Sequence, residues 1–377
     1  MEKKKLPKKY LNIVKHIDKQ WGSLTRNYAN IGSHIDPKFD QEKNKTIEIY
    51  YPHDEDLNKN NIIEKIKKKT KKVKFIKLPK DIKKVLQKDA LLYLPNQYVV
   101  PGGRFNEMYG WDSHFIILGL LKQNKFDIAK GMVENMIYQV KHYGKVLNAN
   151  RTYYLARSQP PLLSQSVLEI YKYSRDKQWL KDQIPVIEKY YYFWISRPRL
   201  QASIGLSRFN SESKEPLPEI VKSYHEQVKK YFREHKVFSY DVKKFYDPKT
   251  DSLTPEFFQA DRTIRESGFD LTSKYGPFGA DITNYIPVSL NCLLYKMEMD
   301  LFYIYQKIKN PEEAETWINR AKARKIQIDQ YLWEEDLGYY FNFNIRTRSI
   351  RPYIFATTFY PLWAELSSED QAKRLIN

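Results

Sequence analysis

The stretch from Pro101 to His114, which reads Pro-Gly-Gly-Arg-Phe-Asn-Glu-Met-Tyr-Gly-Trp-Asp-Ser-His, constrains this chain more than any other. Its two adjacent glycines allow backbone geometry that other residues avoid. A cation (Arg104), two aromatic rings (Tyr109 and Trp111) and a carboxylate (Asp112) follow them. These groups can bind a polyol, because charged groups hydrogen-bond hydroxyls and aromatic rings cover the apolar face of a sugar. Taken alone, the pattern is equally typical of a turn that leads into an amphipathic helix.

Apolar spacing predicts helices in most of the remaining chain. The apolar residues at 129, 132, 133, 136, 137 and 140 form one helical stripe, and a second stripe runs from 290 to 308. Asn310 followed by Pro311 predicts the start of another helix, because asparagine caps helices and proline is tolerated at their first position. Repeated helices joined by long polar loops predict an all-α fold.

Composition limits the classes of function. The chain has 377 residues, of which 42% are hydrophobic and 15% aromatic, as expected for a globular protein. It has one cysteine, no run of about 18 apolar residues and no apolar segment behind its basic N-terminus. We therefore expect a cytoplasmic protein with no membrane partner.

The net charge of +19 could indicate nucleic-acid binding. However, abundant lysine together with asparagine, isoleucine and tyrosine is typical of AT-rich coding, and lysine is often solvated surface. We therefore expect no nucleic-acid partner. One alternative interpretation stays open: a basic helical scaffold that binds nucleic acid or an acidic surface through residues 34–88.

Two more blocks are rich in polar and aromatic residues. Residues 148–161 read Asn-Ala-Asn-Arg-Thr-Tyr-Tyr-Leu-Ala-Arg-Ser-Gln-Pro-Pro, and residues 266–275 read Glu-Ser-Gly-Phe-Asp-Leu-Thr-Ser-Lys-Tyr. An Arg-Ser-Gln loop is by itself typical of a surface turn, and an aspartate after Gly-Phe is typical of a helix N-cap. The three blocks together indicate a sugar-binding site more strongly than any one of them does alone.

The three blocks resemble signatures of the trehalase family. The first matches PGGRFxExYxWDxY except at its last position, where His114 replaces tyrosine. The second resembles NGNRxYYLxRSQPP, with Ala149 for glycine, and the third resembles ESGWDFSSRW. Residues 16–26 are similar to the HIxxLWxxLTR segment that trehalases carry upstream.

The resemblance implies an (α/α)6 toroid and the inverting hydrolysis of α,α-trehalose, with Asp270 as the general acid. It implies no cofactor and no metal, and the seven histidines show no metal-ligand spacing. Leu217 stands where the family has an arginine, which implies fewer donors in the site. The substrate-binding residues implied by the resemblance are Arg104, Phe105, Tyr109, Trp111, Asp112, Asn148, Arg157, Ser158, Gln159, Glu219 and Gly268.

Inverting hydrolysis also needs a second carboxylate that activates water. No residue of this chain matches the family's general base or its second signature. We therefore expect a toroid that is incomplete at its C-terminal side. Two interpretations stay open: a trehalase whose missing C-terminal part a second polypeptide supplies, and a catalytically impaired relative that only binds trehalose or glucose.

The sequence predicts three regions. Residues 1–33 form an N-terminal helical segment, and residues 89–377 form the toroid domain. Residues 34–88 are polar and rich in lysine, so we predict a basic, mobile insertion.

Overall fold

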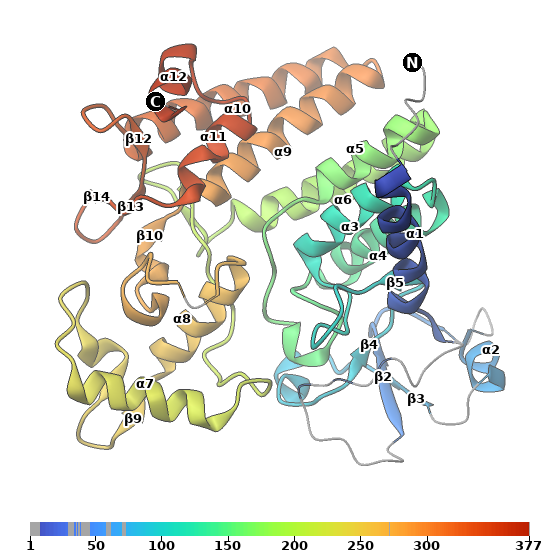
Figure 1. Ribbon diagram of the computed structural model, residues 1–377, viewed down its shortest axis with the longest axis horizontal. Helices are drawn as coiled ribbons and strands as arrows, with labels where there is room; N and C mark the ends of the chain where they lie inside the picture. Colours follow the sequence, from blue (N-terminus) through green and yellow to red (C-terminus); the bar gives the residue numbers. More distant parts are fainter. Residues whose placement is uncertain are drawn as a thin grey trace.

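The computed structural model describes residues 8–28, 34, 36, 38, 46–57, 62–69, 73–270 and 272–376. Parts of the predicted regions 1–33 and 34–88 therefore lie outside the described residues. Helices dominate the structure (Figure 1). They are α1 (Lys8–Leu24), α2 (Ile62–Lys69), α3 (Gly110–Lys122), α4 (Phe126–Tyr143), α5 (Leu163–Ser174), α6 (Lys177–Trp194), α7 (Lys222–Glu234), α8 (Pro255–Glu266), α9 (Val288–Lys307), α10 (Pro311–Leu332), α11 (Tyr360–Trp363) and α12 (Glu369–Ile376).

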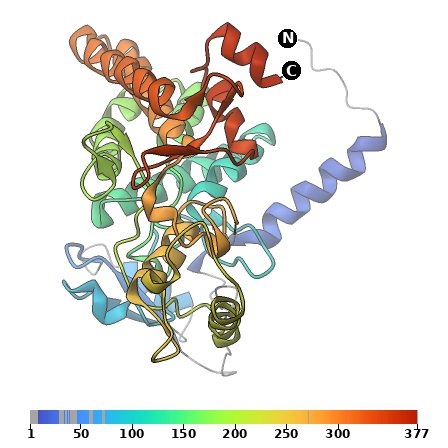
Figure 2. The same cartoon turned by 90° about the vertical axis from the view of Figure 1, so that its left-hand side faces the viewer.

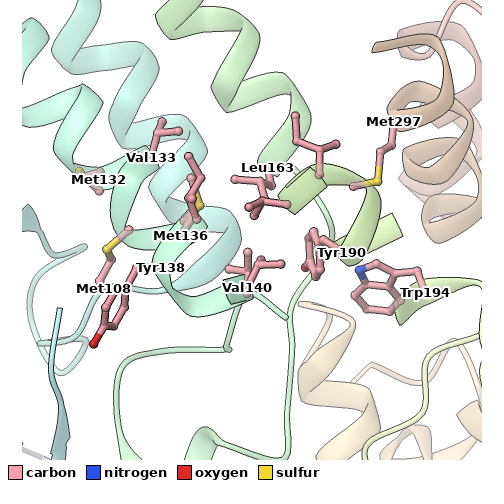
Figure 3. Packing of buried hydrophobic residues seen from close by; sticks show 14 of the residues in the cluster. Met108, Met132, Val133, Met136, Tyr138, Val140, Leu163, Tyr190, Trp194 and Met297 are labelled. Carbon is pink, nitrogen blue, oxygen red and sulfur yellow. The ribbon is translucent and has the colours of Figure 1, made fainter. Parts of the chain in front are cut away.

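Three helix hairpins make up the centre of the molecule. Helices α3 and α4 pack together, as do α5 and α6, and α9 and α10. Helix α6 contacts both α4 and α9, so the hairpins share one apolar core, part of which is seen in Figure 3. The predicted stripe on α4 is confirmed, because Met132, Val133 and Val140 are fully buried in this core.

Local sequence signals fix several helix ends. Asn310 accepts a hydrogen bond from the backbone N–H of Glu313 at 3.2 Å, which confirms the predicted start of α10. Thr254 caps α8 in the same way and is followed by Pro255. Helix α4 ends at Tyr143 and is capped by Gly144, whose φ of 76° is left-handed. These caps define where the loops between the helices begin.

Short strands connect the helices. They are β1 (Thr25–Arg26), β2 (Ile47–Tyr51), β3 (Val73–Lys77), β4 (Leu91–Leu92), β5 (Tyr98–Val99), β6 (Leu200–Gln201), β7 (Leu206–Ser207), β8 (Tyr246–Asp247), β9 (Ser252–Leu253), β10 (Tyr285–Ile286), β11 (Trp333–Glu334), β12 (Tyr339–Tyr340), β13 (Asn342–Asn344) and β14 (Ser349–Arg351). Strand β2 pairs in parallel with β3 and with β4, so its backbone is hydrogen-bonded on both edges.

The described part of residues 34–88 differs from the solvated excursion that its composition predicts. Strand β2, helix α2 and strand β3 form a β-α-β unit there. Ile49 and Leu57 are fully buried, and Ile66 on α2 packs in the same core. The lysines hid this pattern, because the apolar residues between them are few. Lys71 and Lys72 of the predicted lysine run lie outside the described residues.

Helix α1 covers residues 8–24 of the predicted N-terminal segment 1–33. It extends away from the body of the molecule (Figure 2). Ile13 and Ile17 of its apolar stripe remain exposed, whereas Trp21 near its end packs on the core and donates to Gln123 Oε1 at 2.6 Å. Only the last turns of α1 are therefore fixed by the body. No helix in the described ranges is long and apolar enough to span a membrane.

His114 replaces the family's tyrosine at a buried position. It lies on α3 with 7% of its surface exposed, and its Nδ1 is 3.0 Å from Ser166 Oγ on α5. Burial lowers the pKa of His114 to about 4. The folded protein therefore disfavours a proton that the unfolded chain binds readily below pH 6.5.

The unfolding free energy should depend on pH through His114. As the pH falls from 6.5 to 4, the unfolded chain gains a proton there and the folded chain does not, so stability is lost by up to about 3 kcal/mol. His114→Tyr should remove this part of the pH dependence in urea unfolding between pH 7 and 4. Equal pH dependence in wild type and His114→Tyr would contradict the assignment.

Candidate active site

The three sequence blocks meet in one pocket of about 400 Å³. The first block supplies the loop before α3 and the first turn of that helix, the second supplies the loop around residues 148–159, and the third follows α8. The lining residues are Lys38, Arg104, Phe105, Tyr109, Trp111, Asp112, Asn148, Tyr154, Arg157, Gln159, Glu219, Ile220, Arg265, Gly268 and Asp270.

The pocket contains every residue proposed from the sequence except Ser158. Ser158 is buried behind the lining, where its Oγ donates to the carbonyl oxygen of Val146 at 2.6 Å and its N–H donates to Glu266 at 3.2 Å. It therefore holds the loop that carries Arg157 and Gln159. The sequence reasoning missed four lining residues, which are Lys38, Tyr154, Ile220 and Arg265. Tyr154 lies inside the second block and Arg265 directly precedes the third, so their positions in the sequence could have indicated them as lining residues. No motif in the sequence indicates Lys38.

Trp111 forms a rigid aromatic wall. Its backbone N–H donates to Gln159 Oε1 at 2.9 Å, and its ring meets the edge of Phe269 with 6.0 Å between centroids. Gly268 has a φ of 76°, and a Cβ atom at this position would lie 2.7 Å from Trp111 Cζ2. Only glycine allows this backbone to approach the indole so closely.

A buried ion pair crosses the pocket. Arg157 Nη2 donates to Glu219 Oε1 at 2.9 Å and to Asn148 Oδ1 at 3.2 Å. Arg157 Nε and Nη1 and Glu219 Oε2 are buried and have no hydrogen-bond partner among the described residues. Unpaired buried donors and acceptors are costly, so these atoms favour a bound ligand rich in hydroxyl groups.

Two carboxylates face the same pocket. The side chain of Asp270 keeps 53% of its surface exposed, and its Oδ2 lies 3.6 Å from Arg265 Nη1. The surrounding protein desolvates Asp270 and raises its pKa, although Arg265 and Arg157 oppose this shift. Burial also raises the pKa of Asp112, and the negative charge of Asp270 adds to that rise. Raised pKa values favour carboxyl groups that hold a proton and can donate it.

The floor of the pocket rests on Glu107, which is fully buried. Its Oε1 accepts from Arg151 Nε at 3.0 Å. Its Oε2 accepts from Lys38 Nζ at 2.8 Å and from the Tyr109 hydroxyl at 3.2 Å. Glu107 thereby ties the first block to the second. In the described part of the chain, no three His, Cys, Asp or Glu side chains are grouped so that they could hold a metal ion.

Comparisons with known proteins place the chain in a family. The sequence model of the trehalase family matches residues 7–377. The chain belongs to the trehalase family. The cytosolic neutral trehalase of Kluyveromyces lactis is 36% identical over 94% of this chain and 53% of its own length. The cytosolic neutral trehalase of Saccharomyces cerevisiae is 37% identical over 74% of this chain and 39% of its own length.

A solved structure confirms the fold class. The neutral trehalase Nth1 from Saccharomyces cerevisiae superposes with a TM-score of 0.80 at 33% identity, covering 95% of this chain and 72% of that chain. The chain therefore has the helical toroid fold, and the helices in the described residues do not close a barrel. The chain spans about half the length of the Kluyveromyces lactis relative.

Leu217 stands where the family signature has an arginine, is buried at 3% exposure and does not line the pocket. Arg265 lines the pocket, where its Nη2 donates to Asp261 Oδ1 at 3.1 Å and its Nη1 lies 3.6 Å from Asp270 Oδ2. Three guanidinium groups thus line the pocket, because Arg104 and Arg157 also belong to the lining.

Alanine at Gly268 should destabilise the protein through Trp111. Gly144 is a matched control because it has the same φ of 76° and open space around it. Gly144→Ala should cost about 1–2 kcal/mol of unfolding free energy, the cost of a left-handed alanine. Gly268→Ala should cost a further ~1–3 kcal/mol, because the indole must shift to make room. Denaturant unfolding measures both, and equal losses would mean that the indole does not depend on this glycine.

Proposed function

We propose that this chain binds α,α-trehalose in the pocket between its three sequence blocks and that Asp270 protonates the bridging oxygen during inverting hydrolysis. The observation that carries the proposal is the arrangement of Asp270. Its carboxyl group has a raised pKa, is open to the pocket and stands beside unpaired atoms of Arg157 and Glu219. The names of its relatives support trehalose as the substrate and a cytosolic location.

Each part of the pocket has a role in this proposal. Trp111 covers the apolar face of one glucose unit, and Asp112, Arg157 and Glu219 bind its hydroxyls. Asp270 gives its proton to the bridging oxygen as the glycosidic bond breaks, and the departing glucose gains a hydroxyl group. The carboxylate left on Asp270 is then stabilised by Arg265, whose Nη1 is 3.6 Å away.

Inversion also requires a carboxylate that activates water on the opposite face of the sugar. The proposal assigns to this chain the sugar contacts and the acid, and it does not assign the base to any of the lining residues. The second candidate function is a protein that binds trehalose or glucose without cleaving it. The unpaired atoms of Arg157 and Glu219 support this candidate as much as they support the hydrolase, because they would contribute to sugar binding and not to bond cleavage.

Glucose release from trehalose tests the proposal. Asp270→Asn removes the proton donor with little change in size, so release should fall by roughly 10²–10⁴-fold while trehalose still binds. The exposed Asp336 is the control, and Asp336→Asn should release glucose as the wild type does. Release that is unchanged by Asp270→Asn would contradict the role of Asp270. Binding without release in the wild type would support the second candidate, and absence of binding would contradict both.

A further inference from the structure

A lysine from the N-terminal part of the chain reaches the pocket although no sequence block indicates it. Lys38 belongs to the pocket lining, and 3% of its side chain is exposed. A buried ammonium group loses its hydration, so each of its three N–H groups needs a partner. Among the described residues, two of these N–H groups have close partners and the third does not.

Two partners of Lys38 are carboxylates at ion-pair distance. Lys38 Nζ lies 2.9 Å from Asp36 Oδ1 and 2.8 Å from Glu107 Oε2. The remaining contact, to the hydroxyl of Tyr109, is 3.4 Å long, beyond the usual 2.7–3.2 Å range for N–H donors. That hydroxyl already lies 3.2 Å from Glu107 Oε2 and 3.2 Å from the hydroxyl of Tyr154. One N–H of Lys38 is therefore poorly satisfied, and it lies beside two tyrosines that line the pocket.

The position of Lys38 is fixed from several sides. Its backbone N–H donates to Asp36 Oδ1 at 2.9 Å, and Asp36 Oδ2 accepts from the Tyr153 hydroxyl at 2.6 Å. Arg151 Nη2 donates to the carbonyl oxygen of His34 at 2.6 Å. The second sequence block thus holds the residues around Lys38, and the ammonium group cannot turn away from the pocket without breaking buried contacts.

We propose that Lys38 is a substrate-binding residue and that its third N–H donates to a hydroxyl of the sugar in this pocket. The inference rests on the proposed function, because it takes trehalose as the ligand. It adds the N-terminal part of the chain to a site whose other lining residues come from position 104 onward. The competing interpretation is that Lys38 only neutralises Glu107 and Asp36.

A double-mutant cycle between the protein and the sugar separates the two interpretations. Calorimetric titration would measure the binding of trehalose, and of trehaloses that lack a single hydroxyl at position 2, 3, 4 or 6, to the wild type and to Lys38→Met. We expect Lys38→Met to bind trehalose roughly ten- to a hundredfold more weakly, as for a lost charged hydrogen bond. One deoxy analogue should then bind equally well to both proteins. If every sugar is weakened by the same factor, Lys38 is structural and the proposal is wrong.

Two further variants keep the test decisive. Lys38→Arg keeps a cation next to both carboxylates but moves its donors, so it should fold even if Lys38→Met does not, and it should lose discrimination against the same analogue. The exposed Lys84→Met is the control and should bind all sugars as the wild type does. Unchanged binding by the Lys38 variants overturns only this inference. A wild type that binds no trehalose overturns the proposed function, and this inference with it.

Discussion

The pocket depends on a carboxylate that has no contact with solvent. Glu107 lies at 0% exposure, and a charge in that position is tolerated only when it is paired and hydrogen-bonded. Arg151 and Lys38 supply the opposite charges at 3.0 and 2.8 Å. Since Glu107 belongs to the first block and Arg151 to the second, this pairing fixes how the two loops lie against each other.

The same principle recurs around the site. Glu266 is fully buried and accepts from the backbone N–H groups of Ser158 and Asn210 and from Arg199, so it holds the third block against the second. Glu219 is paired with Arg157. Long loops between helices would otherwise be the least ordered parts of such a fold. In this trehalase-family chain, buried ion pairs hold these loops in a fixed geometry around the pocket.

Much of this arrangement could be predicted from the sequence. The helical stripe on α4 is periodic enough to assign its buried face, and the three blocks contain all but four of the lining residues. Ser158 lies behind the lining, which a motif does not reveal, because it shows which residues are close in sequence and not which way each side chain points. Its neighbours Arg157 and Gln159 face the pocket, whereas Ser158 faces Val146 and Glu266.

Other features needed three-dimensional information. Lys38 is separated from the first block by more than sixty residues, and only its contacts with Glu107 and Tyr109 reveal its place in the pocket. The β-α-β unit around β2 was missed because its few apolar residues are diluted by lysine. Arg265 is a further lining residue, and it lies just before the third block, where the sequence reasoning did not look for one.

A double-mutant cycle on Glu107→Gln and Arg151→Met tests most directly whether this buried pair holds the site together. Denaturant unfolding of the wild type, both single variants and the double variant gives the coupling. We predict that each single variant loses up to about 3–5 kcal/mol, because the buried charge that remains has fewer compensating partners. Glu107 then keeps Lys38, and Arg151 keeps Asp89 and Asp36. The double variant should lose less than the sum of the two, by about 0.5–3 kcal/mol. Losses that simply add would contradict the account, because the two side chains would then act independently.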